Sequence, residues 1–172
     1  MAFDTPTLED KRALLASAVA ALREELASIQ AATMDAIAGA THPDNRAEGT
    51  KDMRSTEASY VAAGTGARVL ALDHAVVLCA AVPARVFGES EPARSGALVL
   101  VGDVDEQDPP AWYLLLPEGG GLELRLARSQ ERVRVLTPRS PFGMALSGKA
   151  QGDSVEVELR GVKRSYELLR VV

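Results

Sequence analysis

Apolar side chains recur with a seven-residue period through the first forty residues of the chain. Two series of positions, the second four places after the first, define this period: Leu8, Leu15, Leu22, Ile29 and Ala36, then Arg12, Val19, Leu26 and Thr33. Such 4-3 spacing is typical of an α-helix that packs along a stripe against a partner helix. Thr7 followed by Asp10 resembles a helix start. The pattern predicts a long helix over residues 7–38.

A second stretch has the same spacing and ends before Pro83. Its positions are Ala58, Ala62, Thr65, Val69, Leu72, Val76 and Cys79. Two stripes of this kind are expected to pair with each other as an antiparallel helical hairpin. Small residues near the second stripe, among them Gly64, Gly66 and Ala67, are expected to let the two helices approach closely.

A polar segment, residues 41–57, separates the two helical patterns. Pro43 and Gly49 interrupt any smooth helix there. Its acids and bases are Asp44, Glu48, Asp52 and Glu57 against Arg46, Lys51 and Arg54. We expect the hairpin to carry this segment as a tip and to hold it at the end of two long helices.

After Pro83 the pattern changes to short apolar runs separated by turns. Six runs are candidate strands, at residues 97–101, 112–116, 122–126, 133–136, 155–159 and 165–171. Leu122, Leu124 and Leu126 alternate with charged residues, which is typical of a sheet with one buried and one wet face. The predicted fold class is therefore α+β, with an N-terminal antiparallel helical hairpin (coiled coil) at residues 1–82 and a small antiparallel sheet domain at residues 83–172.

Composition and charge limit the possible location, metal sites and partners of the protein. The chain of 172 residues has a net charge of −5 and a single cysteine, Cys79. It has neither a run of eighteen apolar residues nor a signal-peptide pattern at its start, so we expect a cytoplasmic protein with no membrane partner. One cysteine excludes an intrachain disulfide and a cysteine-based metal site. The acid excess argues against free nucleic acid as the main ligand and favours a protein with a basic cavity.

The connection between the fourth and fifth strands, TPRSPFGMALSGKAQGD at residues 137–153, contains a Gly-x-x-x-x-Gly-Lys string from Gly143 to Lys149. This string does not predict a phosphate-binding loop, because Ala150 stands where a Ser or Thr is needed and no long helix follows. We interpret it as a packed connection with one or two helical turns around residues 143–147.

The combination of a long antiparallel helical hairpin, a polar tip and a small sheet domain resembles the GreA/GreB family of bacterial transcript cleavage factors. The string from Ser140 to Asp153 is similar to that family's Ser-Pro, apolar-apolar, Gly-Lys, Gly-Asp pattern, and EASYVAA at residues 57–63 is similar to the start of its second helix. The resemblance spans nearly the whole chain. It implies that the second half is an FKBP-like domain.

The resemblance also implies a partner and a mechanism. Such factors dock the C-terminal domain at the rim of the RNA polymerase secondary channel and thread the hairpin inward, near the 3′ end of the nascent RNA. The chain would then be an accessory factor without a cofactor of its own, acting as a monomer. Tip carboxylates would help to hold a Mg²⁺ ion at the polymerase active centre, which needs only one or two protein carboxylates beside phosphate oxygens.

The tip departs from the family pattern. In the family, Asp and Glu lie three positions apart, separated by two residues, in a Gly-Asp-x-x-Glu-Asn setting. In this chain Asp44, Glu48 and Asp52 each lie four positions apart. On a helix these three carboxylates would share one face. Asp44 and Glu48 match best by position and are the expected metal-directing pair. The alternative is a tip that reaches the channel without supplying a ligand, which would make the chain an inhibitor.

Two other functions stay open on the residues alone. The FKBP-like resemblance raises a peptidyl-prolyl isomerase, although no aromatic-lined proline pocket is evident in the sequence. The other is a regulator of a metabolic enzyme, as in the related short-hairpin proteins named for nucleoside diphosphate kinase, but the long hairpin predicted here speaks against it. Basic residues of the C-terminal domain are the candidate contacts with the polymerase, namely Arg139, Lys149, Lys163 and Arg164.

Overall fold

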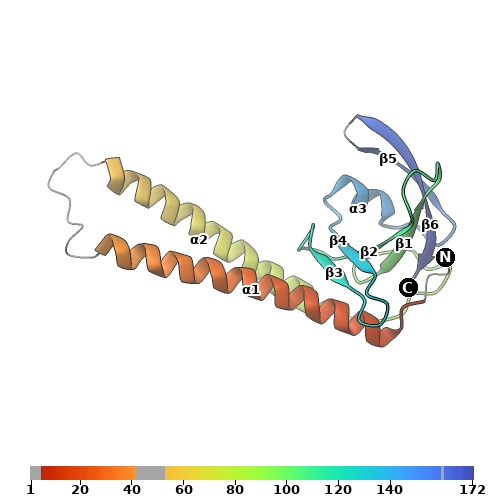
Figure 1. Cartoon of the computed structure of the whole chain (residues 1–172), viewed down its shortest axis with the longest axis horizontal. Helices are drawn as coiled ribbons and strands as arrows, with labels where there is room; N and C mark the ends of the chain where they lie inside the picture. The colour runs from red at the N-terminus through yellow and green to blue at the C-terminus, as the bar shows by residue number, and fades with distance from the viewer. Residues whose placement is uncertain (1–4, 42–52, 160) are drawn as a thin grey trace. The chain divides into compact units, whose positions relative to one another are not determined.

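The computed structural model describes residues 5–41, 53–159 and 161–172, and it confirms the α+β fold class (Figure 1). The elements in chain order are α1 (Leu8–Thr41), α2 (Met53–Ala80), β1 (Leu98–Asp103), β2 (Ala111–Leu115), β3 (Glu123–Arg125), β4 (Arg132–Leu136), α3 (Pro141–Leu146), β5 (Ser154–Leu159) and β6 (Val162–Val171). Both predicted helices and all six predicted strands are present. No helix in the described part of the chain has the length and apolarity needed to cross a membrane.

The chain divides into two compact units. One contains residues 20–77, and the other contains residues 1–19 together with residues 78–172. The first turns of α1 therefore group with the sheet, whereas the sequence placed the whole of residues 1–82 in the hairpin. The helix α2 begins at Met53, so the last five residues of the predicted tip, 53–57, are helical.

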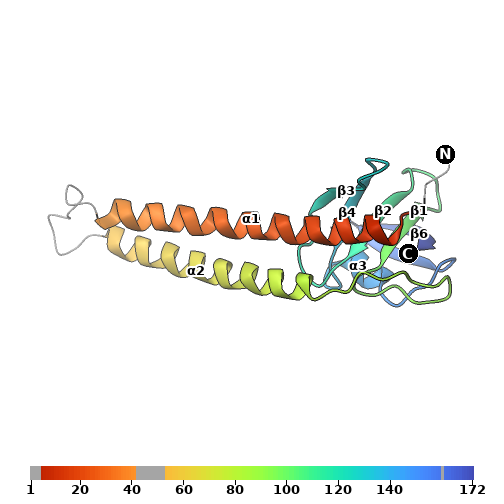
Figure 2. The same cartoon turned by 90° about the horizontal axis from the view of Figure 1, so that it is seen from below.

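In the helical unit, α1 and α2 run side by side in opposite directions (Figures 1 and 2). Leu22, Leu72 and Ala75 are buried, which gives the pair an apolar seam. Arg68 and Glu25 form an ion pair at 2.5 Å across the two helices. This pairing confirms the antiparallel helical hairpin.

The predicted stripe is correct for α2 and partly wrong for α1. Every described stripe position of α2 from Thr65 to Cys79 is buried or half-buried. In α1, Arg12 is exposed, whereas Lys11, Leu14 and Ala18 are buried although they lie outside the predicted stripe. These residues belong to the part of α1 that groups with the sheet, so burial there does not follow the spacing of a helical pair.

Three small residues of α2 expected to bring the helices together face away from the partner helix. Gly64, Gly66 and Ala67 are all exposed. A β-carbon built at either glycine would meet no atom within 4 Å. The expectation that these three residues allow close helix approach is therefore wrong, because they face away from the partner helix.

The sheet has six strands in the order β3-β4-β2-β1-β6-β5. All its pairings are antiparallel except that of β2 with β4, which is parallel. The prediction of a wholly antiparallel sheet is wrong at this pair. The cause is the path of the chain from β2 to β4. β3 pairs with β4 rather than with β2, so β4 lies between β2 and β3 and runs in the same direction as β2.

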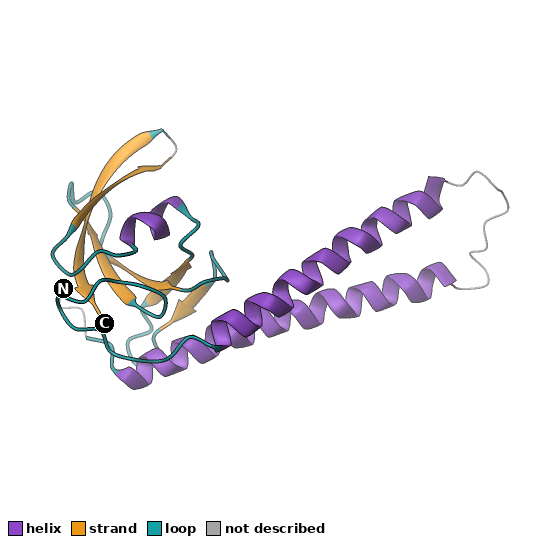
Figure 3. Ribbon diagram, turned by 180° about the vertical axis from the view of Figure 1, so that it is seen from behind, coloured by secondary structure: helices purple, strands orange, loops and turns teal. Residues whose placement is uncertain are grey.

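One face of the sheet packs against α3 and the connection before β1. Its core contains side chains from β1, β2, β5 and β6, together with Phe87 and Leu146. The short helix α3 lies beside the sheet and contacts β5 (Figure 3). This packing fixes the position of the Ser140–Asp153 segment that carries the family resemblance.

A buried lysine joins the start of α1 to two distant segments. The side chain of Lys11 is fully buried. Its ammonium group donates hydrogen bonds of 2.5 Å to the main-chain oxygens of Arg85 and Val172. It also lies 4.5 Å from the centroid of the Phe87 ring, a favourable cation–π distance. The lysine therefore fastens the first turns of α1 to the sheet unit.

Lys11 predicts how stability changes with pH. Burial, helped by the charge of Arg85, lowers the pKa of Lys11 from 10.5 to about 8. Between these two values the unfolded chain still holds the proton that the folded chain has lost, so this group's contribution to the free energy of unfolding rises as pH increases. We expect the stability of the wild type, measured against that of Lys11→Met by urea unfolding, to rise from about pH 8 to about pH 10.5.

The comparison with Lys11→Met removes other alkaline effects. Burial raises the pKa of the Cys79 thiol and of the Tyr113 hydroxyl, so both groups lower stability as pH rises in either protein. They cancel in the difference between wild type and variant. A difference that stays flat or falls over this range would contradict the assignment of the shift to Lys11.

Candidate functional site

The segment from Ser140 to Asp153 begins with a capped helix. The hydroxyl of Ser140 accepts a hydrogen bond of 3.0 Å from the amide of Gly143 and donates one of 2.9 Å to the carbonyl of Thr137. Pro141 occupies the first turn of α3, where its missing N–H is not needed. The Ser-Pro pair of the motif is thus a helix start.

Gly143 is required by a close approach of the chain to itself. A β-carbon at this position would lie 2.1 Å from the carbonyl oxygen of Thr137 and 2.8 Å from the hydroxyl oxygen of Ser140. Both are groups that the cap holds in place, so neither can move away at low cost. No other residue fits here without displacing the helix start.

The later residues of the motif also set backbone geometry. Gly148 has φ of +82° and Gly152 has φ of +87°, a region that favours glycine. The backbones of Gly148 and Lys149 bracket Ala93 with two hydrogen bonds of 2.7 Å. The carboxylate of Asp153 accepts a hydrogen bond of 2.8 Å from the amide of Ala150. The Gly143–Lys149 string is a packed connection, as the sequence predicted.

Three aromatic rings meet under α3. Phe142 packs edge-on against Tyr113 with ring centroids 5.1 Å apart, and against Tyr166 at 4.9 Å. These residues come from α3, β2 and β6 and belong to the core of the sheet unit. The sequence shows no aromatic cluster, because the three positions lie far apart along the chain. On the outer side of α3, Met144 is exposed.

Arg139 and Lys149 flank α3 and are both exposed. Arg139 forms an ion pair with Glu118, although 73% of its side chain remains accessible. The main-chain carbonyl of Lys149 is held by Ala93, whereas its side chain is free to meet solvent. Both bases are accessible to a partner.

Lys163 and Arg164 lie near the start of β6 and differ in their availability. Lys163 is exposed and stands opposite Glu158 of β5. Arg164 forms an ion pair of 2.5 Å with Asp108 and lies 3.9 Å from Asp103. Its hydrogen bond with Asp108 raises the pKa of Arg164, which remains positively charged. Sequence reasoning missed these acidic neighbours.

The expected tip carboxylates Asp44, Glu48 and Asp52 lie outside the described residues. The metal-directing role of the pair Asp44 and Glu48 therefore stays a prediction. Elsewhere in the described ranges, no three His, Cys, Asp or Glu side chains converge closely enough to hold a metal ion.

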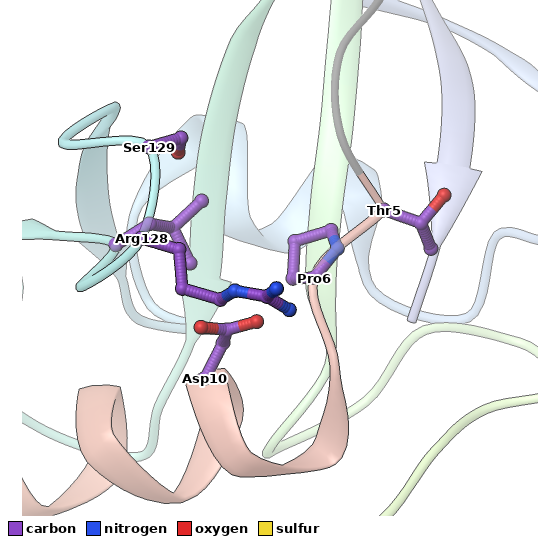
Figure 4. Close-up of a pocket in the computed structure, with 6 residues that line it drawn as sticks. Thr5, Pro6, Asp10, Arg128 and Ser129 are labelled. Atoms are coloured by element: carbon purple, nitrogen blue, oxygen red, sulfur yellow. The ribbon is translucent and has the colours of Figure 1, made fainter.

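A small polar cavity of about 190 Å³ lies at the start of α1 (Figure 4). The carboxylate of Asp10 accepts hydrogen bonds from the amide of Thr7 at 2.9 Å and from its hydroxyl at 2.8 Å. These bonds lower the pKa of Asp10, and the Arg128 guanidinium, which faces it in Figure 4, acts in the same direction. The cavity is explained by the helix cap that the Thr7–Asp10 pair predicts.

Comparison with known proteins supports the resemblance found in the sequence. No family model matches the chain. It is 33% identical to the transcription elongation factor GreA of Ruegeria pomeroyi over 78 residues, which cover 45% of this chain and 44% of that protein. It is 29% identical to GreA of Hyphomonas neptunium over 105 residues, 61% of this chain and 60% of that protein. The chain thus matches less than two thirds of the length of either relative, and this similarity makes it GreA/GreB-like.

Two solved structures, of proteins named Gfh1 and GreA/GreB, match this chain at low sequence identity. Gfh1 of Thermus aquaticus gives a TM-score of 0.37 at 16% identity, covering 87% of this chain and 90% of that chain. A GreA/GreB elongation factor from Nitrosomonas europaea gives 0.36 at 18% identity, covering 67% of this chain and 92% of that chain.

The close approach at Gly143 predicts a large effect of a single methyl group. We expect Gly143→Ala to lower the free energy of unfolding by about 3 kcal/mol, at the upper end of what overpacking costs, because the methyl group would overlap the Thr137 carbonyl. Urea unfolding measures this. Met144→Ala is the matched control, since Met144 is exposed on the same helix and its loss should change stability by less than about 0.5 kcal/mol. Equal effects of the two substitutions would contradict the packing argument.

Proposed function

We propose that this protein is a bacterial RNA polymerase-binding transcription elongation factor that inserts its helical hairpin in the secondary channel and stimulates intrinsic cleavage of backtracked RNA. The observation that carries the proposal is the sequence similarity to two GreA proteins. The antiparallel pair of long helices, α1 and α2, supports it, because a hairpin of that kind can carry a tip into a narrow channel.

The chemistry in this proposal belongs to the polymerase. The chain would act as an accessory factor in the cytoplasm, as a monomer, and Asp44 and Glu48 would supply carboxylate oxygens to Mg²⁺ at the polymerase active centre. Asp52 follows four residues later and would add negative charge on the same side if the segment is helical. The tip would thereby lie next to the 3′ end of the nascent RNA.

Docking is assigned to the basic residues around α3. Arg139 and Lys149 flank this helix, and Lys163 lies on the hairpin of β5 and β6, against which α3 packs. These three bases are exposed, so they can pair with acids of the polymerase. Arg164 already pairs with Asp108, and it would contribute less.

The second candidate function is inhibition of transcription, again through binding to RNA polymerase. The tip carboxylates Asp44 and Glu48 lie four positions apart rather than three, the base Arg46 stands between them, and the base Lys51 follows Glu48. A tip without suitably placed ligands would occupy the channel and inhibit transcription. Cleavage measurements separate the two functions directly.

The test of the tip is RNA cleavage in artificially backtracked elongation complexes of the cognate polymerase. We expect the wild type to accelerate cleavage and Asp44→Ala/Glu48→Ala to lose at least about tenfold of that acceleration, a loss typical of removing groups that support a metal site. Binding to the polymerase, followed in parallel, should be unchanged.

The control for the tip is Asp73→Ala, which removes an exposed carboxylate from the body of α2. This variant should stimulate cleavage by the polymerase as strongly as the wild type does. Intact binding without any stimulation by the wild type would replace the cleavage factor with the inhibitor. Absence of polymerase binding would overturn both functions.

The docking assignment predicts a separate phenotype. We expect Lys149→Glu/Lys163→Glu to weaken binding to the polymerase about tenfold, mainly by slowing association, because it reverses charges at the rim of the interface. Fluorescence anisotropy at two salt concentrations measures this. Arg125→Glu/Arg132→Glu is the matched control, since it changes the net charge equally and both bases are exposed on β3 and β4, at the end of the sheet opposite β5, which α3 contacts. An equal loss in the control would reduce the effect to net charge.

A further inference from the structure

An acidic groove lies on the sheet unit beside the connection between β1 and β2. It encloses about 630 Å³. The exposed acids Glu106, Asp108 and Glu167 line it, and Pro109, Pro110 and Leu169 supply apolar walls. The groove thus offers negative charge and apolar surface within one site.

The floor of the groove is preformed. Leu169 lies over Gly102, where a β-carbon would meet the Leu169 Cδ1 atom at 3.0 Å. Gly102 and Glu167 face each other in the ladder between β1 and β6, so the acid projects from a paired strand, next to a register shift that leaves Leu169 without a partner in the ladder. The two prolines hold the other wall, because their fixed φ angles limit its conformations. A ligand would find this site without first ordering it.

A buried carboxylate at the edge of the groove has one oxygen that accepts no hydrogen bond from the described residues. Asp103 is among the residues that line the groove, and its side chain is only 1% exposed. Its Oδ1 accepts a hydrogen bond of 3.1 Å from the amide of Asp105, whereas its Oδ2 accepts none from any described residue. A buried acceptor without a donor is unfavourable. The nearest cation is Arg164, whose Nη1 lies 3.9 Å away while it pairs with Asp108 at 2.5 Å.

We propose that this groove binds a basic side chain, arginine or lysine, of a protein segment that carries apolar neighbours. The incoming cation pairs with Asp108, Glu106 and Glu167, and the neighbouring side chains pack on Leu169 and the prolines. Arg164 then moves from Asp108 to within hydrogen-bond distance of Asp103 Oδ2, with which it now forms only a long ion pair of 3.9 Å. Binding thereby satisfies a buried acceptor that the free protein leaves without a donor.

The chemistry of the groove favours this occupant over others. Its carboxylates repel the phosphates of a nucleic acid. A divalent metal ion needs several oxygens on one centre, and no described group of three acids is close enough to provide them. A guanidinium or ammonium group on a flexible chain can instead reach separate carboxylates. This inference concerns a surface apart from the tip and stands whether or not the partner is the polymerase.

Titration of the full chain with short peptides, followed by ¹⁵N NMR, tests the proposal. The probes are acetyl-Leu-Arg-Leu-amide and the same peptide with citrulline, which keeps the shape of arginine and removes its charge. We expect the arginine peptide to shift the amides of residues 103–108 and Glu167 saturably, and to shift the Arg164 side-chain signal. The citrulline peptide should bind at least fivefold more weakly.

Variants locate the site. Glu106→Gln, Asp108→Asn and Glu167→Gln should each weaken binding of the arginine peptide about two- to fivefold, the range expected for one exposed ion pair. Glu156→Gln removes an exposed acid of β5 outside the groove and should leave binding unchanged. Equal binding of the two peptides, or insensitivity to the three variants, would overturn the proposal. So would MgCl₂ shifting the same signals at a lower concentration than the peptide, which would assign the groove to a metal ion.

Discussion

The ammonium group of Lys11 holds together three segments that are far apart in the sequence. It donates to main-chain oxygens of Arg85 and Val172, and it shares the Phe87 ring with the guanidinium of Arg85, which lies 3.9 Å from the ring centroid. Arg85 is itself paired with Glu91 at 2.5 Å. A buried cation is costly to desolvate, so such a group specifies one arrangement more than it adds stability. Here it fixes the first turns of α1 on the unit that contains the sheet.

Much of the fold follows from the order of apolar and polar residues. The helix start at Thr7 and Asp10, the stripe of α2 and the alternation in β3 and β5 depend on neighbours a few residues away, and the sequence displays these directly. The exceptions depend on distant contacts. Lysine side chains are mostly exposed in proteins. The burial of Lys11 cannot be seen in the neighbouring sequence, because its partners lie 74 and 161 positions away. The parallel pairing of β2 with β4 likewise depends on where the chain returns, which strand patterns do not encode.

The segment from Ser140 to Asp153 carries the family resemblance for reasons of backbone geometry. Ser140 caps a helix, Gly143 avoids the Thr137 carbonyl, and Gly148 and Gly152 take left-handed angles. A pattern of this kind identifies a fold rather than a chemical site. The assignment of docking residues therefore depends on exposed charges, which local rules leave free to vary. Sequence reasoning named the bases Lys149 and Lys163 for that role, but it could not know that Arg164 is shared with acids 56 and 61 positions earlier in the chain.

Arg164 connects the two charged regions of the sheet unit. It follows Lys163 in the basic region, and through Asp108 it closes one side of the acidic groove. Displacing it from Asp108 would release a positive charge into the basic region if no other acid were near. Asp103 prevents this, because its buried oxygen lies 3.9 Å away and accepts no other hydrogen bond from the described residues. The charge of Arg164 stays neutralised in either position, so the groove can bind a cation while the bases around α3 keep the same net charge.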